Sequence, residues 1–290
     1  MDNKHEFRIV ITPFCNYRCF YCHNEGFVEE YTPLLLSPTD YEFVTSIANR
    51  YWGWDTVTIT GGEPLISPIF RETCQRIKNN ETKITVVTNA SLISSPKKIL
   101  GQCDQVNISL HSVTPEIYKK LTGTSYPVAQ VIDTITSIRS QLPHLTIHLN
   151  STVVKGYNDT ITEMEKLLWL ADRVGAEAKF IDLASENESL IVPASEIQQM
   201  LTAAGFEVYD ESVWQVFLTR DNTKTSITRC GFSERHKDRE KRNLFLNPDG
   251  VISTGVPKEL TISVLREIHA RKEEEFVNKV EWYFPLVKRK

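Results

Sequence analysis

The sequence predicts an α/β protein built as a partial (βα)6 TIM-like barrel with a small C-terminal extension. Short apolar, β-branched runs alternate with longer amphipathic segments about six times between residues 7 and 183. Such alternation implies parallel strands joined by right-handed helical crossovers. A full eight-fold barrel needs roughly 250 residues for its eight units, so a partial barrel fits this chain better. A doubly wound open sheet remains the alternative, because periodicity alone does not exclude it.

Each strand is predicted where β-branched and aromatic residues gather, and each helix where the apolar period is close to 3.6. Two helices are expected to begin at a cap followed by a proline, Ser37-Pro38 and Thr114-Pro115. The predicted strands are Phe7–Thr12, Thr56–Thr60, Lys83–Thr88, Gln105–Leu110, Thr146–Val154 and Ala178–Leu183. The predicted helices are Thr39–Trp52, Pro68–Asn79, Pro96–Gly101, Thr114–Leu121, Val128–Gln141 and Ile161–Val174.

The alternation changes after about residue 190. Asp249-Gly250 between two short apolar runs is a turn signal, and residues 221–242 are polar and charged. We therefore predict a core barrel over residues 1–225 and an extension over residues 226–290 that closes the barrel mouth. The further elements predicted are a helix over Pro193–Ala204, a hairpin within Glu207–Thr219, a hairpin over Leu244–Thr254 and a last helix over Ser263–Lys279.

Composition excludes several classes of protein. Of the 290 residues, 41% are hydrophobic, which is enough for a sizeable core, and the net charge is −4. That charge gives no reason to expect a nucleic acid or an anionic membrane as partner. No apolar run approaches the ~18–20 residues of a membrane span, and the polar N-terminus is not a signal peptide. The protein is therefore expected to be soluble and cytoplasmic.

Three of the six cysteines crowd into eight residues, directly after the first predicted strand. Cys15, Cys19 and Cys22 have the spacing Cys-x3-Cys-x2-Cys, from which thiolates can reach three corners of a [4Fe–4S] cube. The fourth iron would keep an open position that an amine and a carboxylate of a small ligand could chelate. The alternatives are structural zinc with His23 as fourth ligand, and a redox-active or merely buried cysteine group.

Glycine and polar residues stand at the ends of the next predicted strands, where active sites of βα barrels gather. Gly61-Gly62-Glu63-Pro64 follows the second strand, where paired glycines allow a close backbone approach and a carboxylate could accept a bond from an ammonium group. Thr88-Asn89 ends the third strand. Alternation places three polar side chains on one face of the fourth, either as site residues or as a buried polar ladder: Asn107, Ser109 and His111.

With the cysteine spacing and Gly61–Pro64 together, the chain resembles the radical S-adenosylmethionine (SAM) superfamily, and Tyr21 supplies the aromatic residue that the family prefers before the third cysteine. The resemblance implies a radical SAM core barrel with one [4Fe–4S] cluster whose open iron binds SAM. Reduction by an external donor such as flavodoxin or ferredoxin then gives methionine and a 5′-deoxyadenosyl radical, which abstracts hydrogen from substrate. The cofactors carry this chemistry and the protein orients them.

Within the superfamily the chain is similar to the GTP 3′,8-cyclase branch, in runs such as Arg8–Thr12, Thr60–Leu65 and Val154–Asp159. Arg8 is accordingly predicted to hold an anionic substrate, and Lys179 is predicted to join it, with the basic residues of the C-terminal part, at the barrel mouth. The residues predicted to bind SAM are Tyr21, Gly61, Gly62, Glu63, Pro64, Thr88, Asn89 and Ser109.

The C-terminal part departs from that branch, which carries a second cluster on three cysteines. Here Cys230 is present, but Ser233 and Thr254 stand where the other two thiolates would be. We therefore predict a single cluster and a radical SAM enzyme that is not a GTP 3′,8-cyclase. Cys230 itself is either a small buried hydrophobe or a thiol that donates a hydrogen atom to a substrate radical.

The leading functional prediction is hydrogen abstraction from a small metabolite, a nucleotide, nucleoside or sugar derivative, in a biosynthetic epimerisation or rearrangement. The alternatives are a peptide-modifying radical SAM enzyme and, in another class, a non-catalytic iron–sulfur or zinc protein. Residues 229–242 carry six positive and three negative charges, which form either a solvated face or a clamp on a phosphate or carboxylate.

Overall fold

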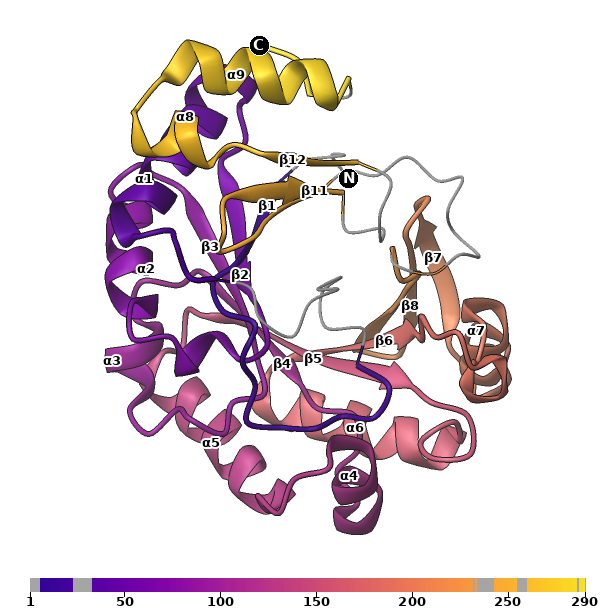
Figure 1. Ribbon diagram of the computed structural model, residues 1–290. Helices are drawn as coiled ribbons and strands as arrows, with labels where there is room; N and C mark the ends of the chain where they lie inside the picture. The colour runs from indigo at the N-terminus through magenta and orange to yellow at the C-terminus, as the bar shows by residue number, and fades with distance from the viewer. Residues whose placement is uncertain are drawn as a thin grey trace.

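The computed structural model describes residues 6–22, 33–231, 233, 243–254, 260–285 and 287–289. Within these residues twelve strands form one curved sheet, in the order β12-β11-β10-β1-β2-β3-β4-β5-β6-β9-β8-β7 (Figure 1). Helices cover its outer face (Figure 1). The end strands β12 and β7 do not pair with each other in this part of the chain, so the barrel is partial.

The strands are β1 (Glu6–Val10), β2 (Thr56–Thr60), β3 (Lys83–Thr88), β4 (Gln105–Ser109), β5 (Thr146–Val153), β6 (Glu177–Asp182), β7 (Glu207–Glu211), β8 (Gln215–Arg220), β9 (Thr223–Thr228), β10 (Asn243–Leu246), β11 (Val251–Ser253) and β12 (Thr261–Ser263). The α-helices are α1 (Pro38–Ile47), α2 (Phe70–Lys78), α3 (Pro96–Leu100), α4 (Pro115–Thr122), α5 (Val128–Gln141), α6 (Ile161–Val174), α7 (Ala194–Ala203), α8 (Leu265–His269) and α9 (Glu273–Tyr283). A π-helical turn, Ala48–Trp52, continues α1.

The sheet order decides between the two predicted architectures. Strands β1 to β6 are parallel and neighbour one another in chain order. A doubly wound sheet instead reverses its order at a switch point and carries helices on both faces. The predicted partial TIM-like barrel is therefore confirmed. It is wider than six strands, because β10 pairs in parallel with β1 and β9 pairs in parallel with β6.

Local sequence explains where the helices begin and end. Ser37 and Asp40 form a capping box at the start of α1, and Pro38 occupies its first turn. The Thr160 hydroxyl accepts the amide of Glu163 at the start of α6. Gly175 ends α6 in the left-handed conformation, with φ of 63°.

The C-terminal third contains one strand that was not predicted and one prediction that was wrong. The polar residues 223–228 form β9, whose side chains Thr225, Ser226 and Ile227 are buried against neighbouring strands. The last predicted helix is instead β12, α8 and α9. Arg271, with φ of 54°, breaks the helical path between α8 and α9.

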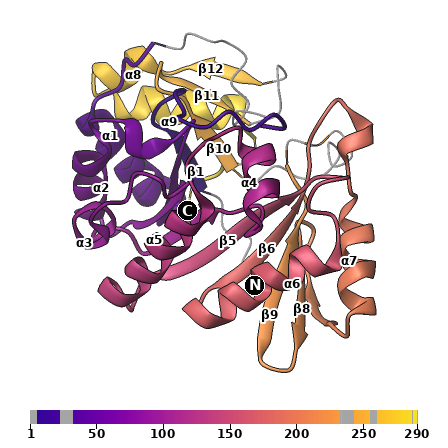
Figure 2. The same cartoon turned by 90° about the horizontal axis from the view of Figure 1, so that it is seen from below.

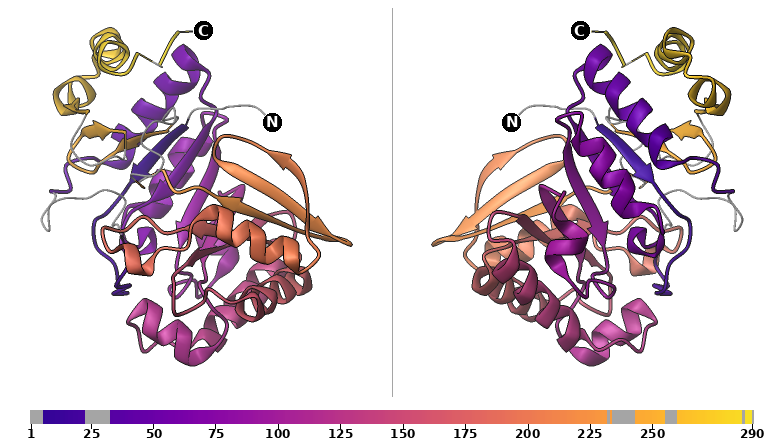
Figure 3. Two further views of the ribbon diagram at one scale, coloured as in Figure 1. Left: turned by 90° about the vertical axis from the view of Figure 1, so that its right-hand side faces the viewer. Right: turned by 90° about the vertical axis from the view of Figure 1, so that its left-hand side faces the viewer.

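The boundary predicted after residue 225 falls inside β9, and the strands of both predicted parts belong to one sheet. The antiparallel hairpins at Glu207–Thr219 and around Asp249-Gly250 are confirmed. Strands β7 to β9 lie beside α7 on one side of the molecule, opposite α8 and α9 (Figure 2, Figure 3). Phe276 of α9 packs on Trp52, with ring centroids 6.2 Å apart. No helix in the described ranges has the length and hydropathy to cross a membrane.

Candidate functional site

A cavity of about 640 Å³ opens within the barrel, in the size range of small-molecule sites, roughly 300–1,000 Å³. It is lined by strand side chains and by the loops that follow β1, β2, β3 and β4. Every residue predicted for the site lines this cavity except Pro64. Pro64 is buried at the start of a 3-10 turn, Pro64–Ile66.

The two glycines at the end of β2 hold the cysteine loop against the sheet. A Cβ on Gly61 would lie 2.4 Å from the Thr12 carbonyl oxygen, and one on Gly62 would lie 2.3 Å from that of Phe14. Only glycine permits this approach. It brings the Gly62 amide to 2.8 Å from the Thr12 oxygen and the Glu63 amide to 2.7 Å from the Phe14 oxygen. The glycines thus determine where the three cysteines lie.

Glu63 ties the end of β2 to the end of β3. One carboxylate oxygen accepts bonds from the Thr88 hydroxyl (2.7 Å) and the Leu65 amide (3.1 Å), and the other accepts the Asn89 amide (2.8 Å). The Asn89 side chain in turn donates to Asn16 in the cysteine loop (2.8 Å). The residues predicted to bind SAM at these two strand ends are therefore also one hydrogen-bonded unit. A bond from Glu63 to an ammonium group remains a prediction.

Glu63 should make stability depend on pH. Burial raises the pKa of this carboxyl group from 4.5 to about 7, although its three donors oppose the shift. Between these values the unfolded chain loses its proton before the folded chain does, so stability falls as pH rises and levels off above about 7. The free energy of unfolding of wild type minus that of Glu63→Gln should therefore decline by about 3 kcal/mol over this window. Urea titrations of both cluster-free proteins at several pH values measure this difference in unfolding free energy. A difference that does not change with pH would contradict the raised pKa of Glu63.

A second set of contacts fixes the far side of the cysteine loop. The Arg18 amide donates to the Thr122 carbonyl (2.9 Å), and a Cβ on Gly123 would lie 2.6 Å from the Arg18 carbonyl. Gly123 ends α4 with φ of 62°, a conformation that favours glycine. The hydroxyls of Tyr17 and Tyr118 bond at 2.9 Å in the core below. The loop is thus held between β2 and α4.

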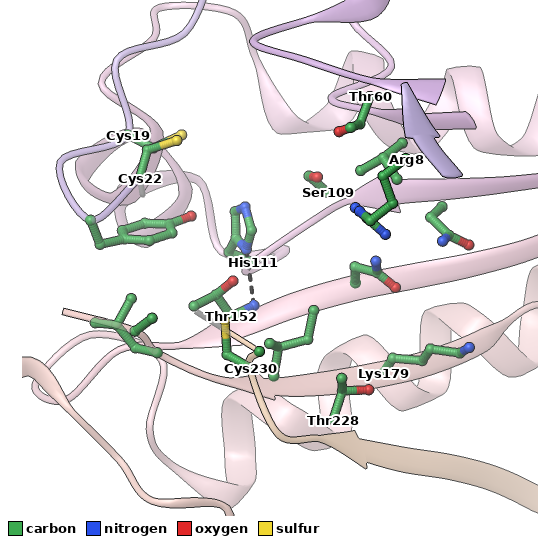
Figure 4. A pocket seen from close by; sticks show the side chains of 18 of the residues that line it. Arg8, Cys19, Cys22, Thr60, Ser109, His111, Thr152, Lys179, Thr228 and Cys230 are labelled. Atoms are coloured by element: carbon green, nitrogen blue, oxygen red, sulfur yellow. Dashed lines mark hydrogen bonds between the residues drawn. The ribbon is translucent and has the colours of Figure 1, made fainter. Parts of the chain in front are cut away.

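Cys15, Cys19 and Cys22 all line the cavity, and the sulfur atoms of Cys19 and Cys22 point the same way (Figure 4). Burial, followed by the neighbouring Cys22 and Cys15 thiols, raises the pKa of Cys19 to about 12. Without a metal, this raised pKa keeps Cys19 protonated. Iron binding reverses that, because a thiol that coordinates a metal is deprotonated. The Tyr21 hydroxyl beside Cys19 is buried and has no hydrogen bond of ordinary geometry among the described residues. Three thiols on one braced loop at the cavity fit an iron–sulfur cluster.

The predicted polar face of β4 does line the cavity, through Asn107, Ser109 and His111. Sequence reasoning missed the matching face of β5, from which Asn150 and Thr152 also line it. Alternation could have suggested them, since His148, Asn150 and Thr152 alternate with the apolar residues Ile147, Leu149 and Val153, with Ser151 as the exception. Asn150 pairs with Ser109 across the strands, so the two polar faces continue each other.

Asn158 joins the ends of β4 and β5. Its side-chain amide donates to the carbonyls of His111 (2.6 Å) and Thr152 (2.9 Å), and its oxygen accepts the Val154 amide (2.7 Å). The side chain is 3% exposed, so solvent cannot replace these bonds. Asn158 therefore positions the strand ends on which His111 and Thr152 stand.

Asn158→Asp should cost about 3 kcal/mol of unfolding free energy. Aspartate has the same shape as asparagine, but an oxygen replaces the amide nitrogen that donates to the two carbonyls. A buried carboxylate oxygen then faces two carbonyl oxygens and has no donor. Asn49→Asp is the matched control, because Asn49 makes one bond, to the Asn80 carbonyl (3.2 Å), from a half-buried position. Urea unfolding of both variants checks the difference; equal losses would mean that Asn158 does not join the strand ends.

The two residues predicted to bind an anionic substrate line the cavity away from the cysteines (Figure 4). The Arg8 guanidinium lies over the Phe245 ring, 5.4 Å from its centroid. Burial lowers the pKa of the Lys179 ammonium group, and no carboxylate in the described ranges lies within ion-pair distance of it. Two cationic side chains therefore line this end of the cavity.

Cys230 and Thr254 both line the cavity, and the Ser233 amide donates to the Cys230 carbonyl (3.1 Å). The Cys230 amide donates to the Asp182 carboxylate, which fixes the cysteine beside the end of β6. Arg229 pairs with Glu211 and bonds two loop carbonyls, of Ser212 and Val213. His23 of the zinc alternative and the basic residues 235–242 of the predicted clamp lie outside the described residues.

A barrel whose carboxyl-end loops bring a cysteine triad to a small-molecule cavity is the arrangement that the radical SAM resemblance predicts. A model described as "Radical SAM superfamily" matches residues 9–168, more than half of the chain, which therefore belongs to this superfamily.

Among curated relatives, the probable GTP 3′,8-cyclase of Thermococcus kodakarensis is 36% identical over 185 residues, 62% of this chain and 57% of the relative. The GTP 3′,8-cyclase of Aquifex aeolicus is 31% identical over 206 residues, 67% of this chain and 63% of the relative. The chain thus spans less than two thirds of the length of either. Among solved structures, Streptococcus suis SuiB bound to S-adenosylmethionine superposes with a TM-score of 0.67 at 14% identity, over 97% of this chain and 65% of SuiB. This last likeness shows the fold.

The exclusion of GTP 3′,8-cyclase activity, drawn from Ser233 and Thr254, was wrong. Curated relatives between 31% and 39% identical carry that name, which points toward the activity rather than away from it. The two missing thiols concern one part of the chain, whereas the likeness to these relatives extends over 62% and 67% of it. The number of clusters is a separate question.

Proposed function

We propose that this chain is a radical SAM enzyme that abstracts a hydrogen atom from an anionic small molecule of the nucleotide class. The observation that carries the proposal is the polarity of the cavity, with thiols at one end and Arg8 and Lys179 at the other. The relatives are named GTP 3′,8-cyclases, which supports a nucleotide as the substrate and makes GTP the first compound to test. The substrate is in this way separated from the thiols but shares their cavity.

In this proposal Cys15, Cys19 and Cys22 hold one [4Fe–4S] cluster, and Gly61 to Glu63, Thr88, Asn89, Ser109 and Tyr21 form the binding site for SAM beside it. When bound, the cluster and SAM supply reductive cleavage of SAM, with the electron coming from a donor of the flavodoxin or ferredoxin type. The protein excludes water, because Glu63, Thr88 and Asn89 are buried at the strand ends. Cys230 stands at the cavity wall as a candidate donor of a hydrogen atom.

Arg8 and Lys179 orient the substrate. Arginine forks suit phosphate oxygens, and a partly desolvated ammonium group interacts more strongly with an anion than an exposed one does. Asn107 and Asn150 add amide groups to the lining of the same cavity. A nucleotide bound there directs its sugar or base toward the cysteine end.

Anaerobic reconstitution with iron and sulfide tests the proposal. We expect about four irons per chain, 5′-deoxyadenosine release that requires SAM and a reductant, and faster release with GTP or another nucleotide. The variant with alanine at Cys15, Cys19 and Cys22 should lose both the iron and the release, while Cys74→Ala, in the buried core, should keep both. A chain that binds one zinc and never forms 5′-deoxyadenosine would overturn the proposal, and about eight irons would overturn the single cluster.

A further inference from the structure

The cysteine loop separates the cavity from the outer surface of the protein by the thickness of one backbone. Its side chains alternate between the two sides from residue 14 to residue 21. The odd-numbered residues line the cavity: Cys15, Tyr17, Cys19 and Tyr21. The even-numbered residues are exposed and lie outside the cavity lining: Phe14, Asn16, Arg18 and Phe20. The thiols are therefore close to solvent on the outer side of the loop as well as to the cavity.

Apolar side chains gather on the outer side of the cysteine loop. Four of them, each between 37% and 51% exposed, come from three loops: Phe14, Phe20, Ile66 and Leu92. These loops touch one another, because the Glu63 amide donates to the Phe14 carbonyl (2.7 Å) and the Asn16 side chain donates to the Ser91 hydroxyl (2.9 Å). Exposed apolar side chains that lie together mark a contact with another molecule, whereas single ones do not.

Positive charge borders these apolar side chains. Arg18 is exposed in the middle of the loop, and the sequence from Thr12 to Cys22 contains no acidic residue. The last turn of α4 adds the exposed Lys119 and Lys120. This turn lies beside the loop, because the Arg18 amide donates to the Thr122 carbonyl (2.9 Å) (Figure 1). An apolar centre with cations around it suits a partner protein whose surface is acidic.

We propose that the outer side of the cysteine loop is the docking site of an acidic electron-carrier protein of the flavodoxin type. The inference rests on the proposed function, which requires an electron for the cluster. One electron leaves the carrier, which is oxidised, and enters the cluster, which is reduced; no other group is transferred. A protein cannot deliver it through the cavity, since about 640 Å³ holds only a small molecule.

Reversal of two charges tests the contact. In the double variant Lys119→Glu/Lys120→Glu, the apparent KM for reduced flavodoxin should rise about tenfold, and by less at high salt, because salt screens exposed charges. The matched control is Lys83→Glu/Lys224→Glu. Both of these lysines are exposed and stand at the amino ends of β3 and β9, at the opposite end of the barrel. The control changes the net charge equally and should keep this KM within about twofold.

The apolar part of the contact is tested by Phe14→Ser, which leaves the backbone carbonyl of residue 14 in place. It should raise the same KM about fivefold, since the ring would lie near the centre of the interface. Val208→Ser is the matched control, because Val208 is similarly exposed, at 42%, but lies on the edge strand β7. An effect of equal size in both variants would contradict a contact centred on the cysteine loop.

The measurement is 5′-deoxyadenosine release at fixed SAM, as a function of the concentration of an acidic flavodoxin and, separately, with dithionite. Dithionite is small and needs no docking site, so release with dithionite should be equal in all variants. The dissociation constant of oxidised flavodoxin, measured without turnover, should rise in parallel with the KM.

An unchanged KM and dissociation constant in the lysine variant would overturn the inference. So would an equal loss with dithionite, which would mean that this surface only supports the fold. A loss that depends on the concentration of substrate or of the enzyme itself would assign the surface to another partner and overturn it as well. A wild-type enzyme that releases no 5′-deoxyadenosine even with dithionite would instead overturn the proposed function, which distinguishes the two failures.

Discussion

Gly62→Ala is expected to destabilise the folded chain by about 3 kcal/mol and to reduce its iron content after reconstitution severalfold. The new methyl group would lie 2.3 Å from the Phe14 oxygen and 2.7 Å from the Pro13 oxygen. Both are backbone atoms, so no side chain can move aside. The cysteine loop must shift, and the bonds from the amides of Gly62 and Glu63 to Thr12 and Phe14 lengthen or break.

Gly156→Ala is the control for conformational strain. Gly156 has φ of 79°, where alanine costs about 1 kcal/mol, but a Cβ there meets no atom within 4 Å. Urea unfolding of the cluster-free chains and iron per chain after reconstitution compare the two variants. If Gly62→Ala binds as much iron as Gly156→Ala, the glycine pair does not position the cysteines.

Lys179→Met should raise the KM for the anionic substrate by about 10- to 100-fold and leave 5′-deoxyadenosine release without substrate unchanged. Methionine has a similar length and no charge, and the site already disfavours the ammonium group, since burial lowers its pKa. The fold should therefore tolerate the change, while a phosphate or carboxylate would lose a partner.

Lys155→Met is the matched control, because Lys155 is exposed and outside the cavity lining. Substrate titrations of both variants, at fixed SAM, give KM and kcat separately. An unchanged KM in Lys179→Met would show that the anion does not lie at this end of the barrel. A fall in kcat alone would point instead to a role in orienting the reacting group.

Much of the fold could be predicted from sequence, because each βα unit carries its own period and its own caps. β2, β3, α5 and α6 have the bounds expected from their patterns. The errors lie where burial depends on distant strands. Thr223–Thr228 has a polar sequence, and it becomes a strand because β6 and β8 cover its two edges. The final helix was divided because Arg271 adopts a left-handed conformation that its sequence does not announce.

The sequence by itself determined the cysteine triad, the glycine pair and the polar face of β4, since each is a spacing along one short segment. Only the tertiary structure decided that Gly61 and Gly62 hold the cysteine loop and that Glu63 is already bonded to Thr88 and Asn89. The physical reason is that a hydrogen-bond partner or a steric contact depends on which strands become neighbours. That choice is made by the whole sheet, through registers no single segment encodes.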